Sequence, residues 1–104
     1  MYKWPDKDKD EIIDYSVDWS RLLGSDSITA VDWYVVNSDG TKTLFTDADI
    51  IDGLQFVTGT LTDTVASARL SLGINNVRYT IACRISTLGG LQYERSIFIR
   101  IKEK

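Results

Sequence analysis

The sequence predicts an all-β protein: an immunoglobulin-like or fibronectin-like antiparallel β-sandwich of about seven strands with an extended N-terminal arm. Two observations support this fold class. Apolar and polar residues alternate with a period of two, and β-branched and aromatic residues fill the alternating runs. These runs are short and are separated by turn-forming residues, as in sandwiches of about this length. A small β-barrel is the main competing architecture.

The chain of 104 residues divides into an extended N-terminal docking arm, residues 1–14, and a single sandwich domain, residues 15–104. The arm mixes carboxylates, lysines and aromatic residues, and Pro5 restricts its backbone. The first strand begins at the domain boundary. It places large residues at every second position on its core face: Tyr15, Val17 and Trp19.

Turn signals punctuate the middle of the chain. Residues 20–27 break the alternation at Gly24 and are predicted to form a loop. Residues 28–36 form a strand, and residues 37–40 (Asn-Ser-Asp-Gly) form a turn, because these residue types tolerate the backbone of tight turns. We also expect short strands at 41–45 and 54–58, a loop or one helical turn at 47–53, and a connection at 60–63.

The last third of the chain carries the clearest strand pattern. Residues 65–72 alternate, with Ala66, Ala68, Leu70 and Leu72 on one face, and end at Gly73, which favours a strand and leaves a helix as the alternative. Two longer runs flank residues 88–91 (Leu-Gly-Gly-Leu) and predict a hairpin. One face of each run carries Val77, Tyr79, Ile81, Cys83 and Ile85, and then Tyr93, Arg95, Ile97, Ile99 and Ile101, and these half-polar faces fit an antiparallel sheet with one side in water. Trp33 and Tyr79 match the central tryptophan and corner tyrosine of immunoglobulin-like domains.

Composition excludes several classes of function. The net charge is −3 and the cations are scattered, so we expect no nucleic-acid binding and no membrane binding. Histidine is absent and Cys83 is the only cysteine, which excludes Ser-His-Asp and Cys-His catalysis and the usual zinc sites. We expect Cys83 to be a buried packing residue. No apolar run is typical of a signal peptide, and we expect synthesis in a reducing cytoplasm.

The acidic residues do not form a convincing chemical site. Three aspartates have the alternate spacing with which a calcium loop begins, but its sixth and twelfth positions are Glu11 and Val17, where Gly and Glu are needed. A sandwich of this size has little room for the cleft that paired carboxylates of a glycosidase require. The aspartates considered are Asp6, Asp8 and Asp10, then Asp32, Asp47, Asp49 and Asp52. We therefore predict no catalytic residue, no metal, no cofactor and no enzymatic activity.

The arm is the predicted partner-binding segment. Buried aromatic residues dominate interface energies, and a proline lowers the entropy lost on docking. The residues expected to contact a partner are Tyr2, Trp4, Pro5 and Tyr15. Simple fraying of a terminus is the alternative. Edge strands offer a route to homo-oligomers by strand pairing.

A second hypothesis is carbohydrate binding, because exposed aromatic rings can stack on sugars. The candidate platforms are Tyr34 and Tyr93, with Trp4 as a third.

Residues 4–23, WPDKDKDEIIDYSVDWSRLL, resemble the opening of a group of short tailed-bacteriophage proteins, with the pattern W-P-D-K-D-P-x-E-x-x-D-Y-x-x-D-W. The likeness continues through the tryptophan-bearing strand at 28–35 and the segments at 79–87 and 95–97. Lys9 stands where the group commonly has proline, which implies a more flexible arm here.

The resemblance implies a non-catalytic virion structural protein made in the host bacterial cytoplasm. It would be a capsid decoration, cement or head-to-tail accessory protein that binds other virion proteins and forms a homo-oligomer on the particle. The alternative is a carbohydrate-binding domain that assists virion attachment to the host surface.

Overall fold

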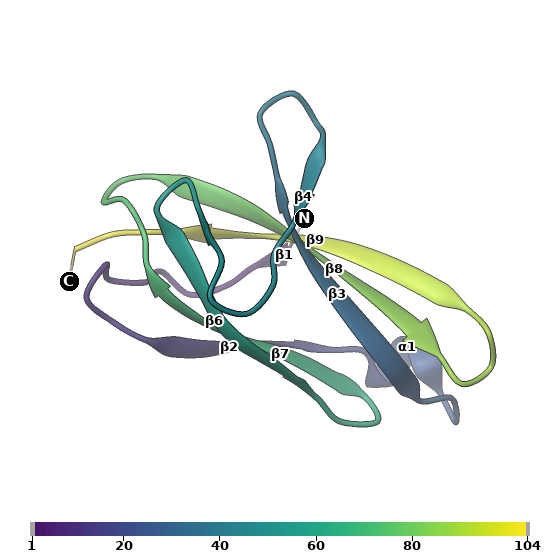
Figure 1. The fold of residues 1–104 in the computed structure, drawn as a ribbon. Helices are drawn as coiled ribbons and strands as arrows, with labels where there is room; N and C mark the ends of the chain where they lie inside the picture. The colour runs from purple at the N-terminus through teal and green to yellow at the C-terminus, as the bar shows by residue number, and fades with distance from the viewer. Residues whose placement is uncertain (1, 104) are drawn as a thin grey trace.

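Two β-sheets pack face to face in the computed structural model, which describes residues 2–103 and every side chain among them except that of Tyr2 (Figure 1). These residues form nine strands and one short helix. In chain order they are β1 Tyr2–Lys3, β2 Ile13–Asp18, α1 Ser20–Leu23, β3 Ile28–Val36, β4 Lys42–Leu44, β5 Ile50–Ile51, β6 Leu54–Leu61, β7 Val65–Leu72, β8 Arg78–Thr87 and β9 Gln92–Arg100.

The strand order confirms the predicted fold class. The first sheet has the order β1-β9-β8-β3-β4 and the second has β2-β7-β6-β5. Neighbouring strands are antiparallel, apart from β1, which runs parallel to β9. The series β9-β8-β3-β4 corresponds to strands G, F, C and C′ of an immunoglobulin domain, and β2-β7-β6 corresponds to B, E and D.

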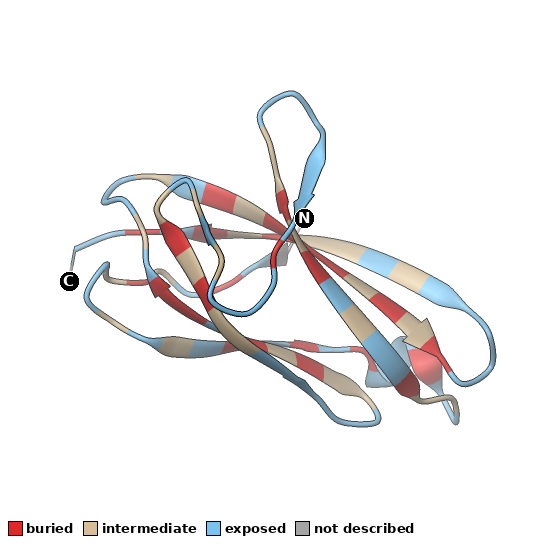
Figure 2. Ribbon diagram, viewed as in Figure 1, coloured by how far each residue is buried: buried red, intermediate tan, exposed pale blue. Residues whose placement is uncertain are grey.

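The core lies between the sheets and is built from alternate positions of their strands, seen as buried bands in Figure 2. Trp33 is 4% exposed at its centre. Tyr79 also is buried, and its hydroxyl donates to the carbonyl of Asp52 at 2.6 Å and accepts from the N–H of Ile74 at 3.1 Å. This side chain ties the start of β8 to two loops, as the corner tyrosine does in immunoglobulin-like domains.

The structure has two strands that were not predicted, β1 and β5, its strand β2 begins at Ile13 rather than Tyr15, and it differs from the sequence prediction in three further places. Residues 20–27 contain helix α1 rather than only a loop, because Leu23 is buried under the sheets. Strand β6 runs to Leu61, past the point where a connection was expected, with a bulge between Phe56 and Thr58. Leu72 is 46% exposed instead of facing the core, since its φ of 59° turns the chain out of the strand alternation.

No helix among residues 2–103 is long and apolar enough to cross a membrane.

Candidate functional site

The N-terminal segment, residues 2–8, lies along β9, and we call it the strap. Beyond β1, the N–H of Trp4 donates to the carbonyl of Phe98 at 3.0 Å, and the N–H of Lys7 donates to that of Arg100 at 3.0 Å. The carbonyl of Lys7 accepts a hydrogen bond from the backbone N–H of Lys102 at 2.8 Å. Because β2, which follows, belongs to the other sheet, the strap joins the two layers of the sandwich.

The aromatic rings predicted to contact a partner lie inside the fold. Trp4 is 7% exposed, stacks on Tyr15 at a centroid distance of 5.0 Å, and donates its indole N–H to the carbonyl of Ser16 at 3.0 Å. The hydroxyl of Tyr15 donates to the carbonyl of Pro5 at 3.1 Å, and burial raises the pKa of Tyr15 to about 12. Pro5 itself is exposed, whereas the side chain of Tyr2 lies outside the described residues. Partner contact through the two rings stays a prediction and requires the strap to leave the sheet.

Lys7 is the strap residue whose placement sequence reasoning missed. Because Lys7 lies between two aspartates, the sequence is typical of a solvent-exposed charged segment, yet the Lys7 side chain is fully buried. Its ammonium donates to the carbonyls of Asp8 at 2.8 Å and Leu72 at 2.7 Å. Two carbonyl acceptors offset part of the cost of burying a charge. The long-range contact with Leu72 is set by the fold and leaves no local sequence signal.

The carboxylates of the acidic run are engaged in the local turn. Asp8 Oδ1 accepts from the N–H of Asp10 at 2.9 Å, and Glu11 Oε1 accepts from the N–H of Asp8 at 2.9 Å. Asp6 pairs with Lys3 at 3.4 Å. Among residues 2–103, no group of three or more Asp, Glu, His or Cys side chains is placed to hold a metal ion.

The two tyrosines proposed for glycan binding do not share a surface. Tyr34 is half-buried on the outer face of the first sheet, where the Arg84 guanidinium lies 4.9 Å from its ring centroid. Tyr93 packs against the core, 6.5 Å from the ring of Trp19. The structure therefore does not bring these rings together into one platform, and carbohydrate binding stays a prediction.

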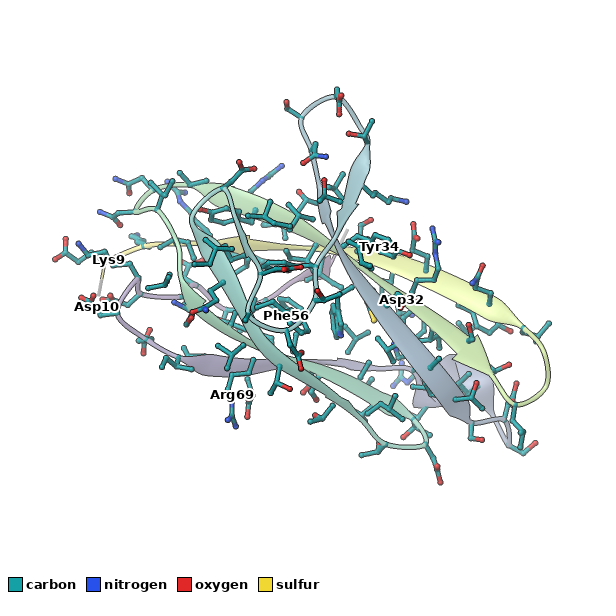
Figure 3. All side chains as sticks on the ribbon, viewed as in Figure 1. Lys9, Asp10, Asp32, Tyr34, Phe56 and Arg69 are labelled. Carbon is teal, nitrogen blue, oxygen red and sulfur yellow. The ribbon has the colours of Figure 1, made fainter. Side chains whose placement is uncertain are left out.

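A groove of about 510 Å³ opens between the sheets where β3 faces β6, and we call it the β3–β6 groove. It exists because both neighbouring edge strands are short. β4 pairs only with residues 34–36 of β3, and β5 pairs only with residues 54–55 of β6. Figure 3 shows Phe56, one of the lining residues, in the space between the sheets. The lining residues are Val31, Asp32, Trp33, Leu44, Phe45, Thr46, Asp47, Phe56, Gly59, Thr60 and Leu61.

Exposed apolar side chains mark the two ends of the sandwich. Leu88 and Leu91, which are 76% and 53% exposed, form the tip of the β8–β9 hairpin. Ile12 and Ile74 are 67% and 52% exposed and lie at the opposite end, before β2 and β8 respectively. The molecule is elongated, 40 × 27 × 25 Å, with the hairpin tip at one end and the β7–β8 loop at the other (Figure 1).

Exposed apolar side chains at two ends and a largely apolar groove are features of proteins that act through contacts with other proteins. The chain matches the family model described as podophage GP4 fiber-tail adaptor protein gp77 over residues 7–100, and it belongs to that family. No match was found among curated proteins.

Membership of this family means that the chain is a non-catalytic structural protein of the phage virion. It is a component of the tail and links fibers to the tail. The resemblance to tailed-phage virion proteins is confirmed at this level, as is the expectation of a non-enzymatic protein. Its partners are other virion proteins.

Proposed function

We propose that the chain works as an accessory protein of the tail by holding a different partner at each end of the sandwich, the fiber at one end and the tail at the other. The observation that carries this proposal is that exposed large apolar side chains lie at both ends of a 40 Å molecule, Leu88 and Leu91 at one end and Ile12 and Ile74 at the other. Solvent-exposed large apolar residues that gather at one place mark protein contact sites.

The fold keeps the two ends at a constant separation. Ile74 precedes β8 and Leu88 follows it, so a strand of ten residues lies between them. That strand is hydrogen-bonded on both sides, to β3 and to β9. A central strand of this kind is a rigid spacer, so one copy offers two partners a defined geometry.

The test is a binding assay with the purified fiber and tail proteins of the same phage. We expect Leu88→Glu with Leu91→Glu to abolish binding of one partner and to leave the other unchanged, and Ile12→Glu with Ile74→Glu to do the reverse. Ile50→Glu, which alters an equally exposed isoleucine on β5, is the matched control. If both end variants bind both partners normally, the two-ended arrangement is wrong.

The same assay addresses the other roles predicted from the sequence. Including the capsid protein tests the decoration and cement role, and the molar mass of the purified chain tests homo-oligomer formation. Glycan-array binding that disappears on changing Tyr34 or Tyr93 would support the carbohydrate-binding alternative.

A further inference from the structure

Two unpaired strand edges border the β3–β6 groove. On β3, the carbonyl of Trp33 accepts from the N–H of Phe45 at 2.8 Å, so the backbone groups of Trp33 point away from β8. Alternation along the strand turns the N–H and C=O of Val31 to the same side. Strand β4 ends before it reaches Val31, and no backbone partner lies there among residues 2–103.

The facing edge belongs to the second half of β6. The N–H of Thr62 donates to the carbonyl of Val65, on β7, at 2.8 Å. The backbone N–H and C=O groups of the even-numbered residues at this end of β6 therefore point toward β7. The N–H and C=O groups of Gly59 and Leu61 therefore point outward, beyond the reach of β5, and have no backbone partner among the described residues.

This β6 edge lacks the devices that usually protect an exposed strand. Edges of natural sheets commonly carry lysine, proline or inward-pointing charges that prevent pairing with another chain. Residues 57–62 read Val-Thr-Gly-Thr-Leu-Thr and contain neither a charge nor a proline. An unprotected edge beside an apolar groove is the arrangement used for strand addition.

The groove has an apolar floor with one polar group. Trp33, Phe45 and Phe56 are each at most 4% exposed beneath it. Gly59 admits a close approach, since a Cβ there would lie 3.0 Å from Phe56 Cζ and 3.4 Å from Trp33 Nε1. The polar group is the indole Nε1 of Trp33 beside Gly59, and a carbonyl entering the groove at Gly59 would lie where it can accept a hydrogen bond from it.

The rim of the groove is acidic. Asp32 and Asp47 are exposed beside the opening, and the lining contains no lysine or arginine. Complementary charge on a partner favours association and selects among partners. The segment that fits this groove is therefore apolar at alternate positions and basic at its flanks.

We propose that an extended segment of a partner virion protein, apolar at alternate positions and flanked by Lys or Arg, binds the β3–β6 groove by adding a strand to β6 at Gly59 and Leu61. Its inward side chains cover Trp33 and Phe56, and its cationic flanks face the acidic rim. This inference rests on the proposed adaptor function for the source of the segment, but it concerns a surface distinct from the two ends.

The experiment uses overlapping 12-residue synthetic peptides that cover the fiber and tail proteins of the same phage. We expect the peptides that bind to have the alternating apolar pattern with basic flanks. In the complex, amide hydrogen exchange of Gly59 and Leu61 should slow by about tenfold or more, since each amide gains a hydrogen bond. The amide of Thr60, already directed at β7, should be unchanged and provides an internal control.

Two variants test the groove directly. Leu61→Lys removes apolar contact and adds a repelling charge, and should weaken peptide binding by about tenfold or more. Leu22→Lys alters a leucine of matching exposure on α1, 46% against 45% for Leu61, outside the groove and the two ends, and should leave peptide binding unchanged. Asp32→Asn with Asp47→Asn, at two exposed positions, should weaken binding and reduce its dependence on salt.

Several outcomes would overturn the inference. Peptide binding without slower exchange at Gly59 and Leu61 would exclude strand addition. Self-association that protects these two amides without peptide would make a second copy the occupant. If no peptide binds although the intact fiber or tail protein does, the groove inference fails and the adaptor function stands. If the intact proteins also fail to bind, the proposed function fails with it.

Discussion

Replacing Trp4 by alanine tests whether the strap is part of the fold. The ring is 7% exposed and lies 5.0 Å from the centroid of Tyr15 and 5.9 Å from that of Trp33. Its N–H bonds the carbonyl of Ser16, on a strand of the other sheet. The substitution therefore removes a contact between the two layers as well as apolar surface.

The expected loss of stability is large. Replacement of a buried tryptophan by alanine costs about 3–5 kcal/mol, and the total stability of a domain is about 5–15 kcal/mol. Trp4→Phe keeps an aromatic ring and loses the indole N–H, so it should cost less, about 1–2 kcal/mol. Leu88→Ala, at a residue that is 76% exposed, should change the free energy of unfolding by at most about 0.5 kcal/mol.

Urea unfolding followed by far-ultraviolet circular dichroism measures these differences without relying on tryptophan fluorescence, which the substitution itself changes. We expect the order of stability to be wild type, Trp4→Phe, Trp4→Ala, with Leu88→Ala beside wild type. A Trp4→Ala protein as stable as Leu88→Ala would refute the reasoning. It would mean that the strap is not held in the sheet in solution, and would favour the docking-arm role predicted from the sequence.

Three further predictions follow from individual side chains. Tyr79→Phe should lower the free energy of unfolding by about 1–3 kcal/mol in urea titrations, because it leaves the N–H of Ile74 without its acceptor. The hydrogen bond from Lys42, and to a smaller extent the one from Arg84, holds the pKa of Glu94 below its ordinary value of 4.5. The ionised carboxylate therefore stabilises the fold above pH 4.5, and this contribution is lost as the pH falls through the lowered pKa. Glu94→Gln should therefore reduce the difference between urea midpoints at pH 7 and pH 3, and an unchanged difference would contradict this assignment. Burial raises the pKa of the Cys83 thiol to about 12, so a thiol-specific disulfide reagent at pH 8 should react with it only after unfolding; rapid reaction of the native protein would argue against a buried thiol.

Local patterning was sufficient to predict much of the fold. The alternation from Val77 to Ile101 predicts the β8–β9 hairpin because most alternate residues enter one continuous core. Arg95 is the polar member of that face and is half-buried, with its guanidinium 4.4 Å from the Trp19 ring centroid. The same logic holds for Trp19 and Trp33, both buried as expected. It fails at Leu72, where the left-handed backbone breaks the period of two that such reasoning assumes.

The surfaces depend on pairings between segments distant in sequence, which local patterns do not encode. Nothing near Lys7 indicates that its ammonium reaches the carbonyl of Leu72. The β3–β6 groove likewise depends on how far β4 and β5 extend along their neighbours and on the bulge after Phe56. Trp4 was predicted to anchor the arm on a partner. In the structure its ring is buried against Tyr15 of the same chain, and contact with a partner stays a prediction.

The parallel pairing of the strap with β9 has a mechanical consequence. A pull on the strap and on β9 in opposite directions along the strands loads their hydrogen bonds in shear, so the bonds at Trp4 and Lys7 carry the force together. An antiparallel hairpin pulled from its open end instead separates one bond at a time. A protein that links a fiber to a tail is under tension whenever the fiber is held while the particle moves. The first and last strands of this chain are arranged to resist that load collectively.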